Sequence, residues 1–234
     1  MVLEGYRDRV RPYVQRLARP FLGWAPSRLS WAALGLAAAA AAVAAAVRWT
    51  TPLLFLPVSA LIVLAGVFDV LDGEVARTTG RASARGDLLD HVLDRYADVI
   101  LVLGFAVSGY AQPLVALLAL VSLLLASYMG TQAQALGQGR LYAGLLARAD
   151  RLVVLALAAF LEFDWSLPWP WMPSEPWSRF HLGGVAFTVI DVAFVYFVIA
   201  GQWTAVARSS DVPGAGAPVA LASPGTATLP PLRR

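Results

Sequence analysis

The chain has 234 residues, of which 59% are hydrophobic and only 14% are charged, and its net charge is +3. A soluble domain usually carries about 25% charged residues, so this composition indicates a membrane protein. The chain has no Cys and only two His, which excludes disulfides, thiol chemistry and a histidine-rich metal site, and the small net charge gives no reason to expect a nucleic-acid partner.

Residues 1–28 are predicted to form an amphipathic juxtamembrane helix and the corner that leads into the first membrane span. Apolar side chains recur at helical spacing at Val10, Val14, Leu17 and Phe21, while arginines occupy the other faces. This pattern favours a helix that lies on an anionic membrane surface, with a solvated helix as the alternative.

Residues 29–207 are predicted to form a transmembrane domain of six helices, so the expected fold is an all-α integral membrane protein in the lipid bilayer. The spans are expected at residues 29–47, 53–72, 86–108, 113–134, 148–160 and 182–204. The Trp-rich residues 161–181 are expected to lie at a membrane interface. Residues 208–234 are rich in Pro, Gly, Ala and Ser and are predicted to be disordered.

The distribution of arginine sets the expected orientation in the membrane. Six spans place both termini on one side, and of the 18 basic residues, all of them arginine, only Arg48 and Arg179 fall on the other side. Because positively charged loops stay in the cytoplasm, the termini and the second and fourth loops are predicted on the cytoplasmic face of the cell membrane.

Carboxylates interrupt the apolar sequence where the second span ends and the third begins. Asp69 and Asp72 are three residues apart, and Asp90 and Asp94 are four residues apart, so each pair lies on one face of a helix. The two spans are consecutive and antiparallel, which brings both pairs to the same membrane face. We therefore predict that the four side chains form one acidic site, facing the cytoplasm.

Clustered carboxylates repel one another and are costly to place in a membrane. Two divalent cations would balance the four charges of Asp69, Asp72, Asp90 and Asp94. Mg²⁺ is the expected ion, with Mn²⁺ as the other candidate, because Mg²⁺ prefers oxygen ligands and keeps positions open for phosphate oxygens. A polar dimer seam and an acid-lined cation transporter are the alternatives, and a transporter needs acids spread across the bilayer rather than at one face.

The acidic stretch also carries a family resemblance. Its fixed positions are Asp69, Asp72, Gly73, Ala76, Arg77, Gly86, Asp90 and Asp94. In this spacing they resemble the signature of the CDP-alcohol phosphatidyltransferases, and the resemblance extends over about residues 26–202. It implies a membrane enzyme, expected to be a homodimer, that moves a diradylglycerol phosphate from CDP-diacylglycerol or CDP-archaeol to an alcohol and releases CMP.

The resemblance implies a role for each motif residue. Asp69, Asp72 and Asp90 would bind the two cations, and Asp94 would bind the second cation and act as general base for the acceptor hydroxyl. A further set would contact the CDP-lipid: Asp69, Gly73, Ala76, Arg77, Gly86 and Ser30. Ser30 is included because residues 26–30, Pro-Ser-Arg-Leu-Ser, resemble the Pro-Asn-x-x-Thr corner of many members, with simple helix capping by Ser27 as the alternative.

The acceptor is predicted from arginines outside the motif. Arg140, Arg148 and Arg151 are expected at the same membrane face as the carboxylates, where they would bind a phosphate by bidentate contacts. The spacing Gly144-x3-Arg148-x2-Arg151 resembles that of members that use inositol phosphate, so a phosphorylated polyol, first of all inositol phosphate, is the expected acceptor. Gln132 stands where such members usually carry basic residues and is predicted to belong to the same acceptor-binding set. An amide-lined pocket there could recognise polyol hydroxyls or a smaller phosphorylated acceptor such as glycerol phosphate, the alternative acceptor.

Four further ionisable residues fall outside these assignments. Asp98 lies one helical turn deeper than the general base and is expected to orient a ligand or a water. Glu74 points away from the acidic face and is predicted to be a solvated interface residue, while His91 is expected to serve helix packing or a dimer contact. Asp191 is a lone acid midway through the sixth span, for which a buried hydrogen bond to another helix is favoured over a functional role.

Overall fold

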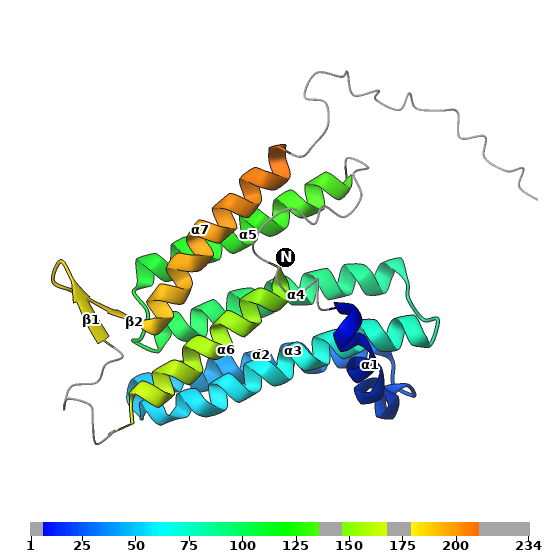
Figure 1. Ribbon diagram of the computed structural model, residues 1–234, viewed down its shortest axis with the longest axis horizontal. Coiled ribbons are helices and arrows are strands. Elements are labelled where there is room, and N and C mark those ends of the chain that lie inside the picture. Colours follow the sequence, from blue (N-terminus) through cyan, green and yellow to red (C-terminus); the bar gives the residue numbers. More distant parts are fainter. Residues whose placement is uncertain (1–6, 136–146, 168–178, 211–234) are drawn as a thin grey trace, which may run out of the picture.

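The computed structural model describes residues 7–135, 147–167 and 179–210 of the chain (Figure 1). Its helices are α1 (Arg7–Ala18), α2 (Pro26–Ala46), α3 (Phe55–Thr78), α4 (Ala84–Val107), α5 (Pro113–Ala135), α6 (Arg148–Trp165) and α7 (Val189–Ser210). Short 3-10 turns at Arg19–Phe21, Val47–Trp49 and Pro52–Leu54 and a hairpin of β1 (Arg179–Leu182) and β2 (Val185–Thr188) complete the described elements. The predicted site residue Arg140, most of the Trp-rich segment and the tail beyond residue 210 lie outside these ranges.

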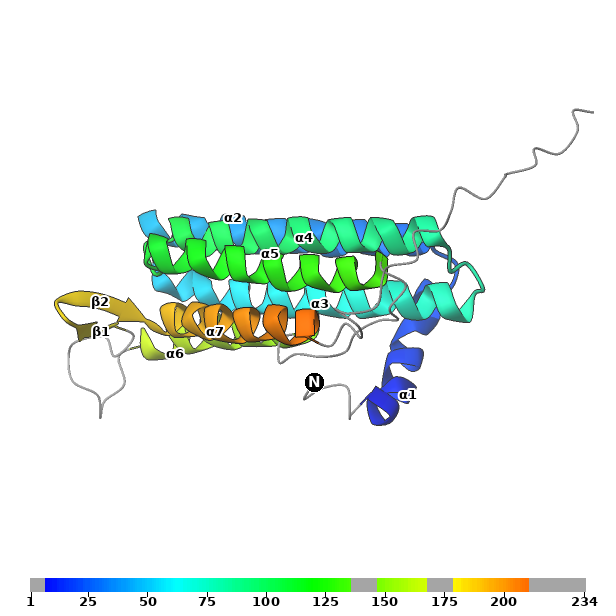
Figure 2. The same cartoon turned by 90° about the horizontal axis from the view of Figure 1, so that it is seen from above.

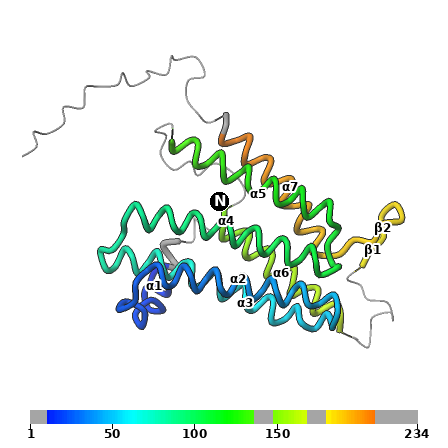
Figure 3. Tube along the Cα trace, turned by 180° about the vertical axis from the view of Figure 1, so that it is seen from behind, coloured from blue at the N-terminus to red at the C-terminus, as the bar shows by residue number. Residues whose placement is uncertain are grey.

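The six longer helices run along a common direction, and α1 crosses them at one end (Figure 2). α2 packs between α3 and α4, α6 packs on α3, and α5 pairs with α7. Figures 1 and 3 show the α5–α7 pair diverging from α4 toward the end of the bundle that carries α1. The acidic residues lie at this same end, because it holds the end of α3 and the start of α4.

Small side chains allow α2 and α4 to approach closely. The Ala-rich face of α2 is buried, and a Cβ atom added to Gly104 of α4 would lie 2.6 Å from the Cα atom of Ala41. Without a hydrophobic drive between helices in lipid, such close van der Waals packing is a main source of helix association. The residues at this contact hold α4, and with it the acidic residues near its start, against the bundle.

Among the residues that the structure describes, four helical segments are long and apolar enough to cross a membrane: Pro26–Trp49, Pro52–Thr78, Pro113–Ala135 and Val189–Arg208. The prediction of a mainly helical membrane protein is therefore confirmed. α4 and α6 do not belong to this set, since charged side chains occupy their first turns, yet both lie lengthwise against the apolar helices (Figure 2). Six spans and a juxtamembrane role for α1 stay predictions.

The expectation of an all-α fold is wrong at one place, between α6 and α7. The sixth span was expected to begin at Leu182, but residues 179–188 form a two-stranded antiparallel hairpin instead. Gly183 and Gly184 close it with positive φ angles of 57° and 81°, the conformation that a two-residue type I′ turn requires. Phe180 and Phe187 face each other across the strands with ring centroids 5.9 Å apart.

Asp191 was expected midway through the sixth span, but it lies in the first turn of α7. It forms a capping box with Thr188: the Thr188 N–H donates to Asp191 Oδ2 at 3.0 Å, and the Asp191 N–H donates to Thr188 Oγ1 at 3.3 Å. Its Oδ1 atom accepts the N–H of Gln112 at 2.6 Å. Glu162 of α6 accepts the N–H of Val189 in the same region, so these buried acids fasten the end of the bundle away from the acidic site.

Candidate functional site

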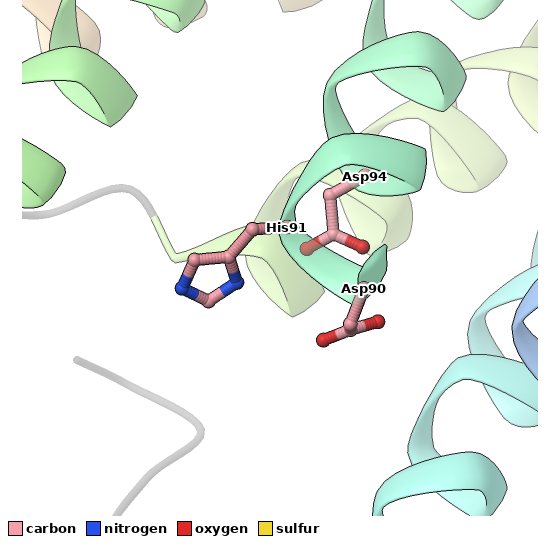
Figure 4. A group of neighbouring side chains, drawn as sticks. All are labelled: Asp90, His91 and Asp94. Carbon is pink, nitrogen blue, oxygen red and sulfur yellow. The ribbon is translucent and has the colours of Figure 1, made fainter. Parts of the chain in front are cut away.

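The end of α3 and the start of α4 bring the predicted carboxylates together. Asp69, Asp72 and Asp90 each offer an oxygen within 4.8 Å of the others, and Asp90, His91 and Asp94 form a second such group on α4 (Figure 4). Asp72 and Asp94 are buried, while Asp69 and Asp90 are half-buried. Hard oxygen donors at this separation suit Mg²⁺ or Mn²⁺, and the buried Oδ1 atom of Asp94 has Nη1 of Arg148 as its ion-pair partner. The residues present therefore fit a divalent cation.

A cavity of about 250 Å³ adjoins the carboxylates, between the starts of α2 and α4 and the end of α3. Its walls include the predicted donor-site residues Ser30, Gly73, Ala76, Arg77 and Gly86. They also include residues that the sequence did not single out or assigned elsewhere: Pro26, Arg81, Ala82, Ser83, Asp87, Leu89 and His91. Asp69, predicted to touch the donor as well, does not line this cavity.

Two glycines leave room in this cavity wall. A Cβ atom on Gly73 would lie 3.3 Å from Nη1 of Arg77, whose guanidinium therefore folds over the helix surface beside it. A Cβ atom on Gly86 would lie 3.3 Å from Oγ of Ser83. That oxygen accepts the Gly86 N–H at 3.1 Å and caps α4. Both glycines therefore serve the local packing of the cavity wall.

Ser30 links the start of α2 to the acidic site. Its hydroxyl donates a buried hydrogen bond of 2.6 Å to Oδ2 of Asp72. The alternative that Ser27 caps this helix is wrong, because α2 begins at Pro26, Ala25 stands at the N-cap position, and no side chain caps it. Proline at the first helical position needs no N–H partner there.

Glu74 is buried, with 4% of its surface exposed, which corrects the expectation of a solvated residue. Its carboxylate accepts a hydrogen bond of 3.1 Å from Nη2 of Arg77 and one of 3.4 Å from Oγ1 of Thr78. The reason is that α3 continues to Thr78, beyond the predicted end of the second span near Asp72, and α1 packs against α3. Glu74 therefore supports the guanidinium of Arg77 at the cavity wall.

Arg148 and Arg151 reach the carboxylates from the start of α6. Nη1 of Arg148 contacts both Asp69 and Asp94, and Nη1 of Arg151 donates to the buried Asp98. Arg148 and Arg151 are thus brought to the acidic site, as predicted.

Gln132 stands apart from this group. It is exposed on α5 and donates to the hydroxyl of Tyr128 one turn earlier. The end of α5 that carries Gln132 diverges from α4 (Figure 3). The expected contact between an amide on α5 and the acceptor site is therefore not part of the described arrangement.

The described helices are those of a polytopic membrane protein. The acidic site at one end of their bundle offers ligands for divalent cations. The chain belongs to the CDP-alcohol phosphatidyltransferase family, whose model matches residues 24–194. This match confirms the resemblance carried by the acidic motif.

Curated relatives share this family's sequence over part of the chain. The archaetidylinositol phosphate synthase of Methanothermobacter thermautotrophicus is 39% identical over 110 residues, which cover 46% of this chain and 56% of that enzyme. The phosphatidylinositol phosphate synthase of Mycobacteroides abscessus is 31% identical over 113 residues, 46% of this chain and 51% of that enzyme. The chain therefore spans about half the length of these relatives.

Solved structures share the fold. The phosphatidylinositol phosphate synthase of Mycobacterium tuberculosis, crystallised with CDP-DAG bound, superposes with a TM-score of 0.66 at 22% sequence identity, over 88% of this chain and 97% of that one. A second crystal structure of that enzyme is a complex with manganese and citrate, again at a TM-score of 0.66. The likeness supports the arrangement of the helices described above.

Proposed function

We propose that this protein is a membrane transferase that moves a diradylglycerol phosphate from a CDP-lipid to the hydroxyl of a phosphorylated polyol and releases CMP. The observation that carries the proposal is the cavity of about 250 Å³ whose walls combine Ser30, Gly73 and Arg77 with the carboxylates Asp72 and Asp90. The donor is CDP-archaeol or CDP-diacylglycerol, and the cavity would take its nucleotide end. In this assignment Arg77, held by Glu74, binds the diphosphate.

Two divalent cations, Mg²⁺ or Mn²⁺, would be held by Asp69, Asp72, Asp90 and Asp94. When bound, they neutralise the diphosphate and stabilise the charge that develops on the leaving CMP. Support comes from the donor atoms of this chain: the oxygens of the first three aspartates lie within 4.8 Å of one another. Ser30 fixes the Asp72 carboxylate by its hydrogen bond of 2.6 Å.

Asp94 is assigned as the general base. It accepts the proton of the acceptor hydroxyl, whose oxygen then forms a bond to the β-phosphorus of the CDP-lipid, while the bond from that phosphorus to the CMP oxygen breaks. Burial of Asp94 keeps water from competing for this position.

Inositol phosphate is the proposed acceptor. Arg148 and Arg151 stand beside Asp94 and Asp98, where they would bind the acceptor's phosphate, and the relatives described above are named as inositol phosphate lipid synthases. Arg140 is kept in the proposed acceptor set on its sequence position alone. Glycerol phosphate remains the competing acceptor on the polar sequence of the second half of α5 alone, because Gln132 does not reach the acidic site in the described arrangement.

The proposal includes a setting in the cell. Residues 1–28, the amphipathic helix and entry corner, lie on the membrane surface. Residues 29–207 form six membrane spans, which include α4 and α6. The acidic site faces the cytoplasm. The uneven distribution of arginine supports this orientation. We also propose a homodimer in the cell membrane.

A reconstituted assay tests the function. The purified full-length protein in vesicles, with CDP-archaeol or CDP-diacylglycerol and Mg²⁺ or Mn²⁺, is offered inositol phosphate, glycerol phosphate, serine and free inositol in turn. CMP release with inositol phosphate supports the proposal. Faster CMP release with glycerol phosphate would mean that glycerol phosphate, and not inositol phosphate, is the acceptor. CMP release with no acceptor at all, or release that survives Asp94→Asn, contradicts the mechanism.

A further inference from the structure

Asp98 contacts two arginines that come from different helices. Its Oδ2 atom accepts a hydrogen bond from Nη1 of Arg151 on α6 and lies 3.4 Å from Nη1 of Arg95 on α4. Both Asp98 and Arg151 are buried, with 5% and 7% of their surfaces exposed. One buried carboxylate thus faces two permanent positive charges, the buried Arg151 and Arg95, whose side chain is 28% exposed.

The two arginines keep unused hydrogen-bond donors. In the described part of the chain, Nε of Arg151 and Nη1 of Arg95 are buried atoms without a hydrogen-bond partner. A purely structural pair between arginine and aspartate is best made with two parallel N–H···O bonds, which would use Nε together with one Nη atom. Here Arg151 donates through Nη1, and its Nε stays available to another oxygen. Donors left unpaired in a buried place are costly unless a ligand satisfies them.

Asp98 is not part of the carboxylate groups that suit a metal. Within the described residues those groups are Asp69 with Asp72 and Asp90, and Asp90 with His91 and Asp94. The proposed function assigns these aspartates to the cations and to proton transfer. Asp98 stands one helical turn beyond them and is directed at arginines.

We propose that Asp98 is a positioning residue, which holds Arg151 and Arg95 so that their remaining N–H donors receive the phosphate of the acceptor. Nη2 of Arg95 also lies 3.7 Å from Oδ2 of Asp94, while Nε of Arg151 is a buried donor that has no partner among the described residues. A phosphate monoester would supply oxygen acceptors and negative charge to these two guanidinium groups. This inference rests on the proposed function and deepens it, because it adds Asp98 and Arg95 to the acceptor side of the site.

Asp98→Asn removes the charge and keeps the shape. Loss of a charged hydrogen bond that fixes a phosphate-binding arginine is expected to raise the KM for inositol phosphate about tenfold. The KM for the CDP-lipid is expected to stay within about twofold, because Asp98 does not line the donor cavity. Asp98→Glu retains the charge and is expected to restore part of the acceptor KM. Equal increases in both KM values, or a fall in kcat alone, would overturn the positioning role.

A double-mutant cycle shows whether Asp98 acts through Arg151. If it does, the double variant that carries both Asp98→Asn and Arg151→Gln has an acceptor KM no more than about twofold above that of the single variant Arg151→Gln. Multiplicative effects of the two changes would mean independent roles and would contradict the proposal. If Asp98→Asn does not fold, Arg95→Gln takes its place, and the same rise in acceptor KM is expected from this less buried partner.

Asp191→Asn is the matched control, since it makes the same chemical change at a buried aspartate that caps α7 at the other end of the bundle. It is expected to lower the Tm and to leave the acceptor KM unchanged. Destabilisation alone is thereby separated from loss of positioning.

Binding measured without turnover separates this inference from the reaction. Inositol phosphate is titrated calorimetrically into the metal-loaded protein without CDP-lipid, and Asp98→Asn is expected to weaken binding about tenfold. Binding by the wild type without any CMP release would refute the proposed reaction and uphold the site. Absence of binding to the wild type, or unchanged binding to Asp98→Asn, would refute the role of Asp98.

Discussion

Ser30 and Asp72 are joined by a buried hydrogen bond of 2.6 Å that connects the first turns of α2 to the acidic end of α3. The hydroxyl occupies one oxygen of a carboxylate that also lies within reach of Asp69 and Asp90. A carboxylate fixed in this way needs less reordering when it binds a cation.

Replacement of this hydroxyl tests its role. Ser30→Ala is expected to lower kcat/KM for the CDP-lipid about tenfold and to raise the concentration of Mg²⁺ needed for half-maximal activity, because ligand-orienting partners commonly contribute that much. Steady-state kinetics in vesicles measure both quantities. Ser59→Ala is the matched control, since Ser59 donates a buried bond of 2.8 Å to the Ala156 carbonyl away from the acids. Identical kinetic losses in the two variants would speak against a special role for Ser30.

Divalent cations are expected to stabilise the folded protein. Saturating Mg²⁺ or Mn²⁺ binds only the folded state, so it should raise the Tm by about 4 °C or more. Asp90→Asn, which removes a member of both carboxylate groups, should lose most of this rise, and Asp191→Asn should keep it. Thermal unfolding of the purified protein with cation and with chelator measures the effect. An undiminished rise in Asp90→Asn would exclude this residue as a ligand.

Glu74 is expected to affect the KM for the CDP-lipid donor and not the KM for the acceptor. It holds Arg77 by a hydrogen bond of 3.1 Å at the cavity wall. Glu74→Gln should raise the KM for the CDP-lipid about fivefold, since the bond to the guanidinium loses its charge, and leave the KM for the acceptor unchanged. A donor KM equal to that of the wild type would mean that Arg77 needs no support from Glu74.

The contact between α2 and α4 is expected to tolerate no added methyl group. In Gly104→Ala the new Cβ would lie 2.6 Å from backbone atoms of Ala41, so the helices must separate, at a cost of about 1–3 kcal/mol. Gly35→Ala is the control in the same bundle, because no atom lies within 4 Å of its added Cβ. Thermal unfolding in detergent compares them, and equal Tm values would refute the close contact.

The acidic end of the bundle could be predicted from sequence because its residues are close together along the chain. Helical spacing pairs Asp69 with Asp72 and Asp90 with Asp94, and a short loop between antiparallel helices brings the pairs together. The family membership and the mainly helical membrane fold followed from the same stretch and from composition. The hairpin at Gly183 was missed because its second strand, Val185–Thr188, is mostly apolar and leads directly into α7, so it resembles the start of a span.

The rest of the site depends on contacts between helices far apart in sequence. Asp98 and Arg151 are 53 residues apart and meet because α4 and α6 flank the same core. Glu74 was misplaced because its burial depends on α1, whose position no periodicity reveals. Asp191 was assigned to mid-span for the same reason: the capping box with Thr188 becomes visible only once the start of α7 is known.

The most direct test of the central claim is the stoichiometry of the reaction in vesicles. CDP-lipid, inositol phosphate and Mg²⁺ are incubated with the wild type and with Asp94→Asn, and CMP and the lipid product are quantified by mass spectrometry. We expect one CMP for each inositol phosphate lipid formed, no product after chelation, and a loss of at least about 100-fold in Asp94→Asn. CMP formed without a phosphorylated lipid product, or full activity in Asp94→Asn, would contradict the account.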